Sequence, residues 1–156
     1  MRTLFRPVVL RFAFAGLAAF ALVLFKTAAP AEALCVTPPE LGKWINVDPS
    51  TQSLTRVELQ FVCQDQILNG QPYPPGPPWY VRVFGKCYPS DCDWGKVGAQ
   101  RLNSGHIYAY YDQGFAKRHV WAKMSDYRPG QLWVYTYTDF TDPNRADYEV
   151  HNWFRH

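Results

Sequence analysis

Beyond its first 33 residues, the chain consists of short runs rich in Val, Tyr, Trp, Phe and Thr, which are separated by Gly, Pro, Asn and Asp. Such runs are typical of β-strands, and the separating residues favour turns. The sequence shows no amphipathic helical period of useful length here. The pattern predicts eight strands, at Lys43–Val47, Leu54–Cys63, Trp79–Lys86, Trp94–Leu102, His106–Asp112, Arg118–Met124, Gln131–Phe140 and Tyr148–Arg155.

Most of these strands are joined by short turns, which favours the pairing of sequence neighbours as antiparallel hairpins. We therefore predict an all-β fold, a single up-and-down barrel, because a closed barrel leaves no exposed sheet edge. A β-sandwich is the main alternative. One connection, residues 64–78, is long; Asn69-Gly70 favours a tight turn there, and its five prolines exclude a central strand.

The alternation of side chains along each strand predicts which side faces inward. In residues 54–63, apolar side chains alternate with Arg56, Glu58 and Gln60, so one face of this strand is predicted to face solvent. The last four strands instead have two apolar faces, one aliphatic and one aromatic. We expect the aliphatic set to line the barrel interior: Ile107, Ala109, Val120, Ala122, Met124, Leu132, Val134, Val150 and Phe154.

Five rings of the aromatic face are the candidate ligand-binding residues: Trp121, Trp133, Tyr135, Tyr137 and Trp153. If the last strands pair in sequence order, these rings lie side by side. Exposed, they would form a platform for a glycan or another ligand, or an interface with a protein partner or a second copy of the chain. The alternative is that the faces are reversed and the rings fill the barrel.

Residues 1–33 have the layout of a secretory signal peptide, in which three arginines precede an apolar run from Phe12 to Phe25 and small residues follow. The run has 14 residues, whereas a membrane-spanning helix needs roughly 20. Cleavage after Ala33 is therefore favoured over a retained anchor. Lipid attachment to Cys35 would need a small residue where Leu34 stands. We predict a signal peptide at 1–33, a barrel domain at 34–156, and a periplasmic or secreted protein.

Charge patterning changes once this leader is set aside. Four of the 16 basic residues and one of the 13 acidic residues lie in residues 1–33, so residues 34–156 carry twelve of each. A neutral domain without a Lys/Arg cluster lacks the footprint of a protein that binds nucleic acid or an anionic membrane. We expect neither as a partner.

All four cysteines, Cys35, Cys63, Cys87 and Cys92, follow the leader, and an even number in a small exported domain favours disulfides. Three pairings are possible. Cys87 and Cys92 enclose only a turn-forming Tyr-Pro-Ser-Asp, so a local bond between them is favoured, which leaves Cys35 for Cys63. A zinc site would need a second ligand pair near Cys87-x4-Cys92. We expect no metal and no cofactor.

Candidate catalytic residues are few. Asp91 and Asp93 flank Cys92 and could act as an acid/base pair or hold a cation, although Asp is also common in turns. The histidines at 106, 119, 151 and 156 have no metal-ligand spacing, and no serine lies in a nucleophile elbow. His119 and His151 fall on the aromatic face, where a surface site could include them.

The segment G-K-W-I-N-V-D-P-S-T at residues 42–51 resembles the Gly-x-Trp opening of calycin barrels, the group that holds lipocalins and avidins. A second segment, F-G-K-C-Y-P-S-D-C-D-W-G at 84–95, adds to this pattern. With both segments, the chain is similar to a group of exported bacterial proteins of unassigned function. The resemblance implies a calycin-like barrel and an exported location. It brings no catalytic residues with it.

These observations predict an exported, non-catalytic protein that binds a small molecule or glycan, through a barrel cavity or through the aromatic face. A cavity would need an unfilled interior, for which Ala109 and Ala122 leave room. One alternative is a protein-interaction or protease-inhibitor-like module that uses the aromatic face or residues 34–41. The other is an enzyme that uses Asp91 and Asp93.

Overall fold

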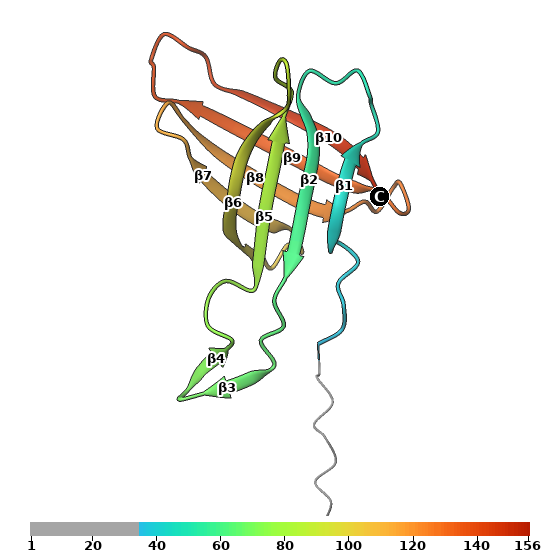
Figure 1. Ribbon diagram of the computed structural model, residues 1–156, viewed down its shortest axis with the longest axis vertical. Helices are drawn as coiled ribbons and strands as arrows, with labels where there is room; N and C mark the ends of the chain where they lie inside the picture. Colours follow the sequence, from blue (N-terminus) through green and yellow to red (C-terminus); the bar gives the residue numbers. More distant parts are fainter. Residues whose placement is uncertain (1–34) are drawn as a thin grey trace, which may run out of the picture. The chain divides into compact units, whose positions relative to one another are not determined.

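The computed structural model describes residues 35–156, which form a closed barrel of eight antiparallel strands and contain no helix (Figure 1). The predicted signal peptide at 1–33 lies outside the described residues. Within them, no helix is long and apolar enough to span a membrane. The barrel strands are β1 (Gly42–Asn46), β2 (Leu54–Phe61), β5 (Trp79–Gly85), β6 (Cys92–Arg101), β7 (Ile107–Asp112), β8 (Ala116–Met124), β9 (Leu132–Phe140) and β10 (Tyr148–Arg155).

The strand order around the barrel is β1-β10-β9-β8-β7-β6-β5-β2, with β2 closing onto β1. Every barrel strand therefore pairs with its neighbours in sequence, and the first barrel strand also pairs with the last. This topology confirms the predicted up-and-down barrel, and the sandwich alternative is wrong. The predicted strand positions agree with the structure to within two residues at each end.

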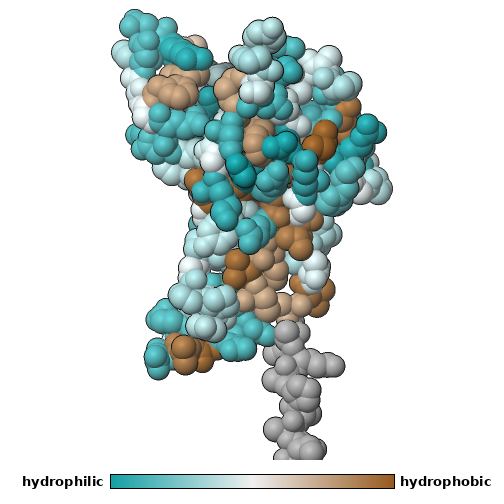
Figure 2. All heavy atoms as spheres, viewed as in Figure 1, coloured by the Kyte–Doolittle hydropathy of each residue, from teal (hydrophilic) through white to brown (hydrophobic). Residues whose placement is uncertain are grey.

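A separate hairpin, β3 (Gln66–Leu68) and β4 (Gln71–Tyr73), lies within the long connection between β2 and β5. The predicted tight turn is present, since Asn69 and Gly70 both have positive φ angles, of 53° and 78°. The two short strands were not predicted; the prolines of this connection argued only against a central strand. The structure tolerates Pro72 because the hairpin stands apart from the barrel, with Ile67 and Leu68 exposed on it (Figure 2).

The barrel interior contains the aliphatic face of the last four strands, as predicted. Most of that set is fully buried, and only Met124 and Val150, at opposite ends of the barrel, are half-buried. Trp44 is buried with them, and its indole N–H donates to the carbonyl of Glu40 at 2.8 Å. Ala109 and Ala122 belong to this filled core rather than to a cavity.

An ion pair with a buried carboxylate lies at the same end of the barrel as Trp44. The Glu40 side chain is 6% exposed and accepts two hydrogen bonds from the guanidinium of Arg101, at 3.0 and 2.9 Å. That guanidinium also lies over the ring of Trp79, 5.2 Å from its centroid. Because the buried carboxylate is paired, its desolvation is offset. Large side chains and this pair close one end of the barrel.

The barrel closes along a short seam between β1 and β10. Their register holds only Ile45 opposite Arg155 and Asn46 opposite Phe154. A buried side-chain bond strengthens the seam, because the amide of Asn46 donates to Asn152 at 2.9 Å and to the carbonyl of Leu54 at 2.6 Å. Buried amides with good partners fix the register of the strands that carry them.

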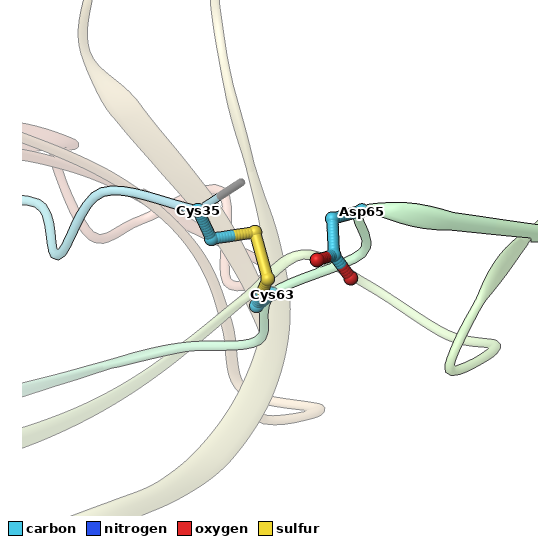
Figure 3. A group of neighbouring side chains, drawn as sticks. All are labelled: Cys35, Cys63 and Asp65. Atoms are coloured by element: carbon cyan, nitrogen blue, oxygen red, sulfur yellow. A yellow bond between two sulfur atoms is a disulfide. The ribbon is translucent and has the colours of Figure 1, made fainter. Parts of the chain in front are cut away.

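Both expected disulfides are present and no cysteine is free. Cys35–Cys63 ties the segment before β1 to the chain that follows β2 and spans 28 residues of sequence (Figure 3). Cys87–Cys92 spans five residues and closes the connection between β5 and β6. Paired cysteines are typical of proteins in oxidising compartments.

The two disulfides are predicted to contribute unequally to stability. Loop entropy assigns roughly 2 kcal/mol to a cross-link as short as Cys87–Cys92 and roughly 3.5 kcal/mol to one as long as Cys35–Cys63. Replacing both cysteines of each pair by serine and comparing urea denaturation should show the larger loss for the Cys35/Cys63 variant. A larger loss for the Cys87/Cys92 variant would contradict this.

Candidate functional site

The inward face of β8 and β9 becomes polar toward one end of the barrel. On β9, the inward positions Leu132 and Val134 are followed by Thr136 and Thr138. On β8, Arg118 has the same inward parity as the buried residues that follow it along the strand. This end carries the β1–β2, β5–β6 and β9–β10 connections and lies opposite the β3–β4 hairpin (Figure 1). We call it the mouth.

Strand register places four inward side chains of the mouth in one row. Tyr111 on β7 lies opposite Arg118, Arg118 lies opposite Thr138, and Thr138 lies opposite Tyr148 on β10. Directly opposed residues on one face of a sheet are close enough for their side chains to interact. Thr136 lies one inward position deeper on β9. The row therefore forms a polar layer across four strands.

Beside this layer lies a hollow of about 340 Å³ at the mouth. The surface at this end of the molecule is mostly hydrophilic (Figure 2). The walls of the hollow come from six strands or their connections and combine apolar, aromatic and polar groups. They include Leu54, Trp94, Gln113, Phe115, Arg118 and Thr136.

Four buried polar atoms at the mouth have no hydrogen-bond partner within residues 35–156. They are Oγ1 of Thr136, Oγ1 of Thr138, Oε1 of Gln113 and Nε of Arg118. Thr136 is 1% exposed and Thr138 is 0% exposed, so open solvent does not reach either side chain. A buried polar group without a partner costs about 1–3 kcal/mol. A molecule in the hollow could supply the missing hydrogen bonds.

Arg118 is the charged group of this layer. Burial lowers the pKa of its guanidinium, while charge interaction and a hydrogen bond with Tyr148 raise that pKa and the cation of Arg145 lowers it further. Arginine nonetheless stays protonated in proteins. No acidic side chain of the described chain forms an ion pair with Arg118. The mouth therefore contains a half-buried positive charge without a carboxylate partner.

The Arg118 guanidinium packs against the ring of Trp94. Their separation is 4.1 Å from the guanidinium carbon to the ring centroid. The position of Trp94 follows from a bulge in β6, where Trp94 and Gly95 face a single residue of β5 and Gly95 has a φ of 85°. Gly85 leaves space for the indole, since a Cβ there would lie 3.1 Å from its Nε1. The backbone of this rim is shaped to hold one arginine–tryptophan stack.

The alternative carboxylate pair, Asp91 and Asp93, lies on the rim, but each acid has its own partner. Asp91 accepts a hydrogen bond from the Thr55 hydroxyl at 2.7 Å. Asp93 accepts from Arg82 at both carboxylate oxygens, and this bond holds the pKa of Asp93 below its ordinary value. An ionised, paired carboxylate is a poor proton donor near neutral pH. The geometry shows two structural contacts rather than an acid/base pair.

The structure brings the five predicted ligand-binding residues together on the outer surface of β8, β9 and β10. The Trp121 and Tyr135 rings are 5.2 Å apart, and the Trp133 and Tyr135 rings are 6.0 Å apart. Tyr137 contacts the ring of His119, and Trp153 lies opposite Trp133 in register. All five side chains face outward and are half-buried. The alternative in which they fill the barrel is therefore wrong.

The histidines extend the aromatic face instead of forming a separate site. The ring of His119 contacts those of Tyr108, Tyr110 and Trp121. The ring of His151 contacts those of Trp133 and Tyr135. The hydroxyl of Tyr108 lies 2.8 Å from Nδ1 of His119. The imidazoles thus pack with the rings, which places polar atoms among them.

One cluster of potential metal ligands in the described residues has a different explanation. Cys35, Cys63 and Asp65 place their ligand atoms within 4.8 Å of one another (Figure 3). The two sulfurs are bonded to each other, so neither is the thiolate that a metal requires. This cluster is a disulfide with a neighbouring carboxylate.

Sequence reasoning missed the residues of the mouth. Arg118 was assigned to a strand without a role, and Thr136, Thr138 and Gln113 were not singled out. A signal was present on β9, where two threonines continue an inward alternation that begins with Leu132 and Val134. Their meeting with Arg118 depends on strand register, which the local sequence does not contain.

The aromatic face is predicted to contribute to stability, because each ring is covered in part by its neighbours. Trp133→Ala and Tyr135→Ala should each lower the free energy of unfolding by about 1–3 kcal/mol in urea denaturation. Tyr127→Ala is the control, since this ring is 90% exposed. Unchanged stability in the first two variants would show that the rings do not pack together.

Comparison of the chain with models of protein families, with curated proteins and with solved structures finds no match. The fold itself, a closed antiparallel barrel of eight strands, is consistent with a calycin-like architecture. What the protein does must therefore be argued from the chemistry of its own sites.

Proposed function

We propose that this chain is an exported, non-catalytic binding protein that holds a small molecule in the mouth of a calycin-like barrel. The observation that carries the proposal is Thr136, a residue that is 1% exposed and lines the hollow, and whose hydroxyl has no hydrogen-bond partner in the described chain. Natural proteins rarely leave buried polar groups unpaired without a reason. A bound ligand is such a reason.

The position of the hollow limits the size of the ligand. The barrel centre is filled by the core that includes Trp44, Ile107 and Phe154, all at most 1% exposed. A ligand therefore enters only as far as the threonine layer. The volume of about 340 Å³ lies near the lower end of the range for small-molecule pockets, roughly 300–1,000 Å³. A small metabolite fits this site better than a long lipid chain.

Export is supported by the two disulfides and by the signal-peptide layout of residues 1–33. The wider likeness to exported bacterial barrels of unassigned function agrees with this location. The enzyme alternative has less support, because Asp91 and Asp93 have separate structural partners. Binding without turnover is therefore the function that the mouth favours.

Glycan binding by the aromatic face is a second candidate function. Its rings are half-exposed and lie among hydrogen-bonding groups, such as the Tyr135 hydroxyl that donates to Glu149 and the imidazole of His119. Aromatic faces with polar atoms at their edges suit sugars, which present both C–H and hydroxyl groups. Loss of glycan binding in Trp121→Ala, with the fold retained, would support this second function.

Ligand binding at the mouth predicts two effects of Thr136→Val, one on stability and one on binding. Removing a hydroxyl that has no partner should leave the ligand-free protein equally stable or more stable, because the desolvation cost disappears. The same change should weaken ligand binding. Native mass spectrometry of protein purified from the exporting cell should show a non-covalent adduct on the wild type that is reduced or absent on Thr136→Val.

Thr136→Ser is the matched control, since it keeps the hydroxyl and should keep the adduct. A bare wild-type mass, or an adduct that Thr136→Val does not affect, would contradict binding at the mouth.

A further inference from the structure

We propose that the ligand of the mouth is a small organic acid whose carboxylate binds the guanidinium of Arg118. This inference rests on the proposed function, and it adds the chemical class of the ligand. It is carried by the half-buried Arg118, its unpartnered Nε and its position at the wall of the hollow.

A half-buried guanidinium normally has an anionic partner, because desolvating a charge is costly unless a counter-charge compensates it. Two other ion pairs of this chain follow that rule, since the half-buried Arg56 pairs with Glu58 and the buried Glu40 pairs with Arg101. Arg118 has no such pair in the described residues. The missing anion is therefore the group that a ligand should bring.

The surrounding charges also favour an anion. Lys86 lines the hollow, and Arg145 is close enough to act on the charge of Arg118. Asp93 is the acid that lines the hollow, and Arg82 already neutralises it. The walls of the hollow thus carry two cations, Lys86 and Arg118, against one acid that is already paired, and a cleft lined by positive charge attracts anionic ligands.

Arg118 keeps a free donor for a planar carboxylate. Its guanidinium carbon lies over the Trp94 ring, 4.1 Å from the centroid. The side chain forms one hydrogen bond with Tyr148, and its Nε has no partner in the described chain. A carboxylate binds in the plane of a guanidinium through paired, charge-assisted hydrogen bonds. The contact with Trp94 restrains the Arg118 side chain before the ligand arrives, which reduces the entropy lost on binding.

One charge on the ligand matches one half-buried cation. Lys86 and Arg145 are exposed, so neither is a half-buried cation as Arg118 is. A phosphate would be expected to need a second enclosed cation or a nest of backbone N–H groups. The remaining walls include Leu54, Phe115 and Val150, so the body of the acid can be apolar or aromatic. Thr136 and Gln113 can bind a hydroxyl on that body.

The test compares small carboxylates with their neutral amides on the ligand-free protein. Ligand-observed NMR titrations would use benzoate against benzamide, phenylacetate against phenylacetamide and 4-hydroxybenzoate against 4-hydroxybenzamide, with inorganic phosphate added separately. A charge-assisted hydrogen bond predicts that the carboxylates bind about tenfold or more tightly than the amides. Arg118→Gln should remove this preference.

Arg128→Gln is the matched control, because Arg128 also lies over an indole, that of Trp153 at 4.4 Å, but on the outer face. The Arg128→Gln variant should keep the preference for carboxylates over amides. Arg118→Lys keeps the charge without the planar fork, so it should weaken the preference and gives a second variant if Arg118→Gln folds poorly. Near-ultraviolet circular dichroism checks the fold of each variant.

Each result decides between the proposals. Equal binding of carboxylates and amides would overturn the anion inference but leave the mouth as a ligand site. A carboxylate preference that survives Arg118→Gln would place the anion elsewhere, and tighter binding of phosphate would overturn the chemical class. Binding of none of the probes, together with a bare native mass, would overturn both this inference and the proposed function.

Discussion

Closure of the barrel along the β1–β10 seam is the constraint on which the rest of this structure depends. Only two register pairs join these strands, and the buried amides of Asn46 and Asn152 reinforce them. Closure removes the sheet edges and directs every inward side chain into one narrow space. The sizes and polarities of these side chains then decide where the barrel is solid and where it is open.

At one end that space is filled by Trp44 and closed by the buried Glu40 and its ion-pair partner Arg101. At the other end, threonines replace aliphatic residues and Arg118 points inward. A threonine is similar in volume to valine but adds a hydroxyl, so the mouth changes in chemistry more than in width. The Cys87–Cys92 bond and the Arg82–Asp93 pair then hold its rim, where Trp94 supports Arg118. The site thus combines fixed walls with unpaired polar atoms.

Much of this fold could be predicted from sequence, because strand alternation is a local property. The inward aliphatic set, the outward aromatic set and the turn at Asn69-Gly70 all follow from residues that are close in sequence. The candidate site could not be found in the same way. Arg118 and Thr138 are 20 positions apart and meet only through the register of β8 and β9. The β3–β4 hairpin was missed because a rule that holds for central strands does not apply to an isolated, exposed pair.

The most direct test of ligand binding at the mouth is a high-resolution crystal structure of the wild-type protein, purified from the exporting cell in a buffer without carboxylates. The account predicts ordered density for a small molecule within hydrogen-bond distance of the Thr136 hydroxyl, with an acidic group on the guanidinium of Arg118. A mouth that holds only water, or that side chains close completely, would contradict it.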